Sequence, residues 1–165
     1  MLVRDLGLPA QLTGAGMGLG VLAEVGALLA YPSLARRYSL RTLLAIGFGA
    51  SAVRWLLLSR AQSPFALVSL QLLHAATFGL WWGAAVQAMG ELVPAPLRAT
   101  GQALFSALVF GIGNSAGYAL AGAGYDHFHS VSPLFAIAGL VEVAGLALLL
   151  LFGKAVEQQM SRGKI

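Results

Sequence analysis

The amino-acid sequence predicts an all-α integral membrane protein, with five transmembrane helices in a single membrane domain over residues 1–165. Hydrophobic residues make up 58% of the chain and charged residues only 10%, whereas a soluble domain carries about 25% charged residues. The apolar stretches are long and unbroken, without the alternating pattern of a membrane β-barrel. Because lipid offers the backbone no hydrogen-bond partner, such stretches form helices.

Five apolar segments are each long enough for the roughly 20 residues that cross a bilayer. They cover approximately residues 8–31, 42–60, 64–90, 99–123 and 133–153. Turn-forming and charged residues separate them at 31–41, 60–64, 91–101 and 124–133, and a polar tail follows at 154–165. The first segment is too long for a signal peptide, and Glu24 lies in its second half.

The basic residues are distributed unequally between the two ends of these segments. One end has seven of them: Arg36, Arg37, Arg41, Arg98, Lys154, Arg162 and Lys164. The other end has two, Arg4 and Arg60. Because loops rich in lysine and arginine stay in the cytoplasm, we expect an external N-terminus and a cytoplasmic C-terminus.

The remaining composition excludes several function classes. The isoelectric point is near 10, but the basic residues lie in short clusters between apolar segments, so membrane topology explains them better than binding to nucleic acid. The chain has no cysteine, which excludes disulfides and thiol catalysis. His127 and His129 follow Asp126 closely, but two imidazoles do not complete a metal site. We therefore expect no metal and no cofactor.

Four ionisable side chains lie within the apolar segments: Glu24, Arg54, His74 and Glu142. Each is costly in hydrocarbon, so each is expected to face a partner or a water-filled cavity and is a candidate functional residue. Glu24 lies eight residues before Pro32, about 12 Å from the inner boundary at 1.5 Å per residue. A carboxylate at that depth is either a fixed member of an ion pair or a group that binds protons or solute.

The other three ionisable residues have less defined roles. The long side chain of Arg54 either extends to the outer interface beside Trp55 or faces a cavity. His74 forms a hydrogen bond between helices or contacts a solute. Glu142 has apolar neighbours on all sides and ranks below Glu24.

Polar and aromatic residues share a predicted helix face with His74: Gln71, Thr77, Phe78 and Trp81. A pocket for a small organic molecule has this mixture of apolar walls and a few polar groups. We expect Gln71, Thr77 and Trp81 to line such a cavity, together with Asn114 from the fourth segment. Glycine pairs four residues apart, at 14 and 18, 16 and 20, and 113 and 117, favour close helix packing.

Several motifs follow one another along the chain in a defined order. The loop LARRYSLRTLL comes after the segment with Glu24, and VRW, LLHAATFG and PAPLRATGQAL come later. This order resembles the second half of a major facilitator superfamily transporter, from about residue 10 to 153. The similar groups are the bacterial 3-phenylpropionate transporters and the oligosaccharide:proton symporters. The resemblance implies that the five segments correspond to helices eight to twelve of twelve in the bacterial inner membrane.

The resemblance also implies roles for individual residues. Arg54 resembles the ninth-helix arginine and His74 the tenth-helix histidine of proton-coupled sugar symporters, with Glu24 nearby. The glutamate that carries the proton in those symporters is replaced by Thr77, so that role does not transfer. We expect Glu24 to offset the charge of Arg54, with His74 as a hydrogen-bonding neighbour around a shared cavity.

The predicted function is transport and not catalysis. On this interpretation, the chain is a fragment of a secondary active transporter that couples protons to symport of an aromatic acid, sugar or nucleoside by alternating access. Its expected partners are the solute, protons, the lipid bilayer and an N-terminal helix bundle that transport requires. The alternative is a non-transporting five-helix membrane subunit that serves in assembly. An intramembrane enzyme that uses Asp126, His127 and His129 is a weaker alternative.

Overall fold

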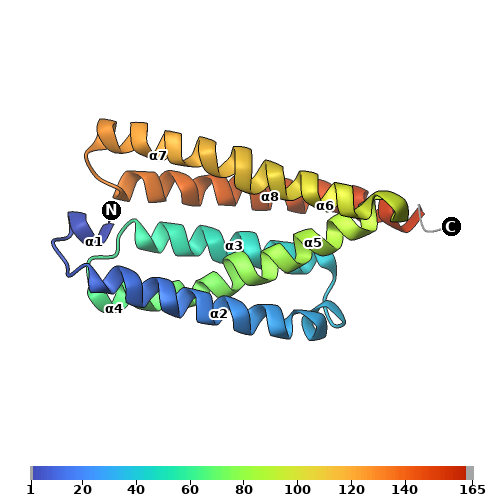
Figure 1. Ribbon diagram of the computed structural model, residues 1–165, viewed down its shortest axis with the longest axis horizontal. Helices are drawn as coiled ribbons and strands as arrows, with labels where there is room; N and C mark the ends of the chain where they lie inside the picture. The colour runs from blue at the N-terminus through green and yellow to red at the C-terminus, as the bar shows by residue number, and fades with distance from the viewer. Residues whose placement is uncertain (1, 163–165) are drawn as a thin grey trace.

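The computed structural model describes residues 2–162, with side chains described as far as Gly153. Within this part of the chain all regular secondary structure is helical (Figure 1). Five helical rods are long and apolar enough to cross a membrane: Gln11–Ala35, Leu40–Leu58, Pro64–Leu92, Ala95–Phe128 and Ser132–Gly153. The all-α, five-helix prediction is confirmed. The side chains of Lys154, Arg162 and Lys164, which contribute to the predicted cytoplasmic side, lie outside the described part.

Two of the five rods change helix type along their length. The third consists of α4 (Pro64–Ser69), the 3₁₀ turn η1 (Leu70–Leu73), the π-helix η2 (Ala75–Leu80) and α5 (Trp81–Leu92). The fourth consists of η3 (Ala95–Leu97), α6 (Arg98–Ser106), the π-helix η4 (Ala107–Gly113) and α7 (Asn114–Phe128). The others are α2 (Gln11–Ala35), α3 (Leu40–Leu58) and α8 (Ser132–Arg162), preceded by the short α1 (Leu2–Asp5).

The helix boundaries follow from local sequence, and three of them differ from prediction by four or five residues. The fourth rod spans Ala95–Phe128, where the sequence predicted 99–123. Ser39 and Ser63 cap α3 and α4, because each hydroxyl accepts a hydrogen bond from the backbone N–H three residues later, at 3.2 Å. His129 ends α7 in the left-handed conformation, with φ of 53°. The prediction that the first segment ends near residue 31 is wrong, since α2 continues through Pro32 to Ala35. Proline has helical φ, so the helix can continue through Pro32, although proline lacks the N–H that would donate to the carbonyl oxygen four residues earlier.

Close packing between α3 and α8 organises one half of the molecule. These helices run antiparallel (Figure 1) and make the most extensive contact between described elements. A Cβ atom at Gly139 would lie 2.7 Å from the Leu56 side chain, and one at Gly145 would lie 2.8 Å from the Phe48 ring. These glycines therefore allow α8 to approach α3 at two levels, one on each side of Glu142.

The other half is built by α2 against η1 and η2. Gly16 and Gly20 lie against the Gln71 and His74 side of the third rod, as the glycine spacing predicts. A Cβ atom added at Gly14, Gly18 or Gly117 would meet no other atom within 4 Å among the described residues, so the packing role expected for their pairs stays a prediction.

An apolar cluster closes the end of the molecule that contains the N-terminus. Its buried members are Leu2, Leu58, Leu67 and Val131. Asp5 fastens α1 over this cluster, because its carboxylate accepts hydrogen bonds from the Tyr125 hydroxyl at 3.0 Å and the Val131 N–H at 3.1 Å. The segment before α2 is thereby tied to the loop between α7 and α8.

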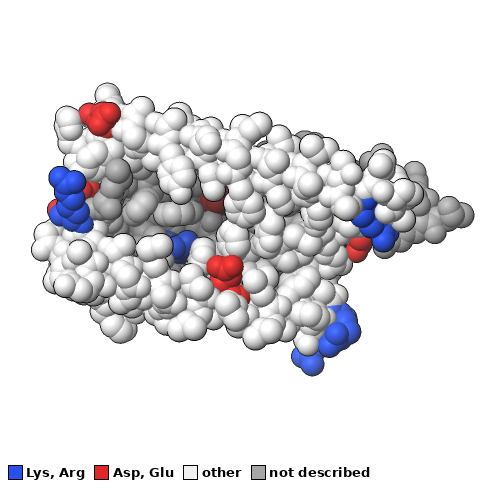
Figure 2. Space-filling view, viewed as in Figure 1, with Lys and Arg blue, Asp and Glu red and all other residues white. Residues whose placement is uncertain are grey.

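The surface is apolar along the rods and charged at their ends. In Figure 2 acidic and basic side chains gather near both ends of the view, and the hollow between the upper and lower rods also contains charge. Large apolar side chains are exposed along the rods, among them Leu29 and Leu151. Such a surface suits a lipid environment.

Candidate functional site

The candidate site lies where the third rod departs from α-helical geometry. His74 connects the 3₁₀ turn η1 to the π-helix η2, and π-helical segments occur frequently at functional sites. Gly79 in η2 allows α2 to come close, because a Cβ there would lie 2.7 Å from the Ala27 Cβ and 3.1 Å from the Glu24 carbonyl oxygen. This approach brings the Glu24 side chain beside the rod that carries His74.

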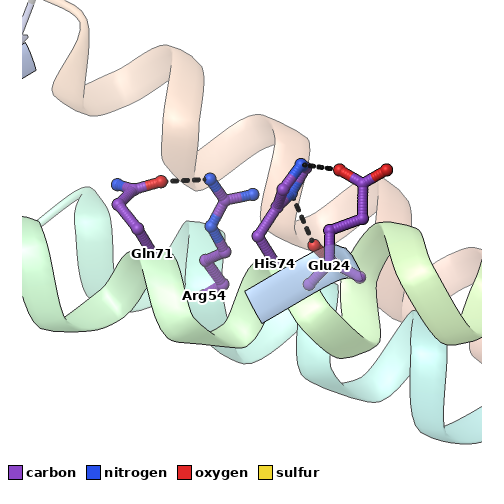
Figure 3. A network of polar contacts seen from close by, with 5 residues as sticks. Glu24, Arg54, Gln71 and His74 are labelled. Carbon is purple, nitrogen blue, oxygen red and sulfur yellow. Dashed lines mark hydrogen bonds and ion pairs between the residues drawn. The ribbon is translucent and has the colours of Figure 1, made fainter. Parts of the chain in front are cut away.

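Glu24 and His74 form a direct pair (Figure 3). The Glu24 Oε2 lies 3.3 Å from the His74 Nε2, and the two side chains are 19% and 27% exposed. The other ring nitrogen of His74, Nδ1, lies 3.4 Å from the Thr77 hydroxyl. The imidazole stacks on Phe78 at a ring-centre distance of 5.5 Å. Both ring nitrogens of His74 therefore have polar neighbours, and its orientation is fixed.

Arg54 has a different partner. Its Nη2 donates a hydrogen bond of 2.6 Å to the Gln71 Oε1 (Figure 3), and Gln71 Nε2 donates to the Leu67 carbonyl oxygen at 3.1 Å. The guanidinium also lies 5.1 Å from the centre of the Trp55 ring. Its Nε is buried and has no hydrogen-bond partner among the described residues. One donor of Arg54 is thus left unused in an apolar setting.

The expected pairing of Arg54 with Glu24 is wrong in the described structure. Glu24 pairs with His74, and Arg54 pairs with Gln71. The physical reason is helical register: Gln71 and His74 are three residues apart, about one 3₁₀ turn, so each offers a separate partner on the same side of the third rod. The two pairs are neighbours along one helix and not a single ion pair.

A cavity of about 240 Å³ lies beside the Arg54–Gln71 pair. Thr13, Arg54 and Gln71 supply its polar groups, and its walls are otherwise apolar. The apolar lining is Leu2, Val3, Leu12, Gly16, Met17, Trp55, Leu58, Leu67 and Phe135. Arg54 therefore faces a cavity, which decides between the two orientations left open by the sequence. Figure 2 shows charge within the hollow between the rods.

A second cavity of about 180 Å³ lies between α3, η2 and α8. Its lining is Gly47, Phe48, Ser51, Thr77, Phe78, Trp81 and Glu142. Thr77 and Trp81 thus line a cavity other than the one that Gln71 lines. Asn114 is exposed on α7 and lines neither cavity. Sequence reasoning missed Ser51, although it lies three residues before Arg54, within one helical turn of it.

The fold and the site together define a class of protein. Five membrane-length apolar helices surround ionisable side chains and cavities, which is the arrangement expected of a multi-pass membrane transporter. A family model described as the MFS_1 like family matches residues 1–137. The chain belongs to this family of the major facilitator superfamily.

One curated relative is described as a transporter. The chain is 25% identical over 137 residues to the "Uncharacterized transporter YwbF" of Bacillus subtilis (strain 168). The matched region covers 83% of this chain and 34% of that protein, so the chain spans about a third of the relative's length. No solved structure matches the chain.

Proposed function

We propose that this chain is the part of a proton-coupled symporter that corresponds to helices eight to twelve of a twelve-helix transporter. On this proposal it lies in the bacterial inner membrane with an external N-terminus and a cytoplasmic C-terminus. Family membership and the similarity to a longer transporter support the proposal. Alternating access then requires a second helix bundle, because transporters of this type rock two bundles around a site near the middle of the membrane.

The observation that carries the proposal is the guanidinium of Arg54 beside an apolar cavity. Among the described residues its Nε donor is unused, and its Gln71 partner is neutral. A buried positive charge that faces a neutral partner is costly, and an anionic group that enters the cavity lowers this cost. Guanidinium binds carboxylate or phosphate through paired hydrogen bonds. A small organic solute with an anionic group and an apolar body fits these properties, so an aromatic acid is favoured over a sugar or nucleoside.

The Glu24–His74 pair supplies the proton-coupling group of the proposal. Protonation of Glu24 removes its negative charge and weakens its attraction to His74. His74 begins the π-helical turn and follows the 3₁₀ turn that holds Gln71. A change in the Glu24–His74 pair is therefore transmitted over one turn to the Gln71–Arg54 pair, which contacts the solute cavity.

Uptake by the complete transporter tests the proposal. We expect reconstituted protein to take up radiolabelled 3-phenylpropionate in preference to lactose or uridine when a proton gradient is applied. Glu24→Gln should abolish gradient-driven accumulation and retain exchange of solute across the membrane, because exchange needs no net proton movement.

Arg54→Lys should weaken solute binding by about tenfold or more, since lysine cannot form the paired hydrogen bonds of arginine. Arg60→Lys, an exposed matched change, should behave as wild type. Unchanged proton-driven accumulation in Glu24→Gln would refute the coupling role, and unchanged solute affinity in Arg54→Lys would refute the solute site.

A further inference from the structure

Glu142 faces the interior of the molecule and not the lipid. It lies three residues from both Gly139 and Gly145, which contact Leu56 and Phe48 of α3. Residues three apart share a helix face, so the same face of α8 directs Glu142 toward the α3 surface between those two contacts. Ser51 is buried in that surface, and it lines the same cavity as Glu142.

The cavity beside Glu142 reaches the Glu24–His74 pair through one residue. Thr77 lines this cavity of about 180 Å³. The same threonine hydroxyl lies 3.4 Å from the His74 Nδ1, and the His74 Nε2 lies 3.3 Å from Glu24. Two intramembrane carboxyl groups, on α8 and α2, are thus joined by a cavity, a hydroxyl and an imidazole.

We propose that the cavity between α3, η2 and α8 is a second proton-binding site, in which Glu142 holds the proton and Thr77 connects it to His74 and Glu24. The cavity is polar at Glu142, Ser51 and Thr77 and has room for water, which needs such partners. The inference deepens the proposed symport function and rests on it for the use of the proton. It does not involve the solute cavity at Arg54.

The proton transfer balances at each atom. Glu142 gives up its carboxyl proton to a water molecule in the cavity and becomes a carboxylate. The Thr77 hydroxyl accepts a proton from that water and donates its own to the His74 Nδ1. The imidazole then releases the proton on Nε2 to the Glu24 carboxylate, so that His74 ends neutral with its proton on the other nitrogen. One proton has moved from Glu142 to Glu24.

Few ionisable side chains lie near Glu142 in the described part of the chain. From α3, Arg54 is turned toward Gln71, and Arg41 donates to the Leu150 carbonyl oxygen two turns further along α8. The third rod contributes His74, and the ionisable Tyr118 of α7 is exposed. The ionisable residues Tyr125, Asp126 and His127 lie at the far end of α7. Among the cavity-lining residues, Glu142 is the one that carries an ionisable side chain.

Infrared spectroscopy of the full-length protein in lipid nanodiscs tests the proton-binding site. We expect the difference spectrum between acidic and neutral pH to contain a carboxylic-acid C=O band that is lost in Glu142→Gln. The band should persist in Asp126→Asn, which removes an exposed carboxylate at the end of α7. If Glu142→Gln does not fold, Ser51→Ala should shift the band frequency, because it removes the neighbouring hydroxyl. A spectrum unchanged by either variant overturns the site.

Nitrogen-15 NMR of the His74 ring tests the connection. The titration of the His74 ring should change in Glu142→Gln, since interacting sites titrate as a pair. Thr77→Val should remove the response of His74 to Glu142, whereas Thr100→Val, an exposed matched change, should leave it. Identical His74 titrations in wild type, Glu142→Gln and Thr77→Val overturn the connection. Neither measurement needs a solute or a gradient, so failure here is distinct from failure of the uptake test.

Discussion

The contact between Gly79 and α2 makes the Glu24–His74 pair sensitive to a single methyl group. In Gly79→Ala the new Cβ would lie 2.7 Å from the Ala27 Cβ and 3.1 Å from the Glu24 carbonyl oxygen. Carbon atoms in contact prefer about 3.5–4.0 Å, so α2 and η2 must separate by about 1 Å. The Glu24–His74 distance of 3.3 Å would then exceed the roughly 4 Å within which an ion pair forms.

The expected loss of stability is about 1–3 kcal/mol, which is typical of overpacking in a close contact. Gly90→Ala is the matched control, because Gly90 lies on the same rod and a Cβ there meets nothing within 4 Å. Both variants gain the same helix propensity from alanine. The difference between their free energies of unfolding therefore reports the effect of the steric clash alone.

Unfolding of the purified protein in detergent micelles measures the difference in stability, and NMR of His74 reports on the pair. Ala27→Gly in the Gly79→Ala background should restore part of the stability, because it removes the atom at 2.7 Å. If Gly79→Ala is as stable as Gly90→Ala and retains the signals of the paired imidazole, the reasoning from helix approach is refuted.

Two further predictions concern the end of the molecule that contains the N-terminus. Asp5→Ala removes the acceptor of the Tyr125 hydroxyl and the Val131 N–H, so it should release α1 from the loop before α8. Amide exchange at Val131 should accelerate, and equal exchange in Asp5→Ala and the control Asp126→Ala would contradict this. His129→Gly should stabilise the protein by about 0.5–1 kcal/mol, because glycine adopts the left-handed conformation at φ of 53° without a Cβ clash. The midpoint of thermal unfolding measures this gain. An unchanged or lower midpoint would show that the His129 side chain makes compensating contacts.

The membrane fold could be predicted because hydropathy acts over whole segments. A run of about 20 apolar residues has few structures available to it in lipid, so all five rods are found near their predicted positions. The helix boundaries depend on single residues and are predicted less accurately. Proline favours a helix end, but α2 continues past Pro32 to Ala35.

The candidate site was predictable in its residues and not in its pairs. Glu24, Arg54, His74 and Glu142 are conspicuous because ionisable groups are rare in hydrocarbon. Which of them meet depends on the rotation and approach of separate helices, and the sequence does not contain these quantities in readable form. The 3₁₀ and π-helical turns from Leu70 to Leu80 also change the residue spacing. A regular helix would place Gln71 and Thr77 in the same cavity, whereas they line two different cavities.

By itself the sequence determined that the chain crosses a membrane, how many times, and which side chains are too polar for lipid, because these properties follow from each residue's transfer free energy. Only the tertiary structure decided that Glu24 meets His74, that Arg54 meets Gln71 and that Glu142 and Ser51 line one cavity. Those contacts depend on where glycines let one helix come close to another, and such an approach is a property of two surfaces together.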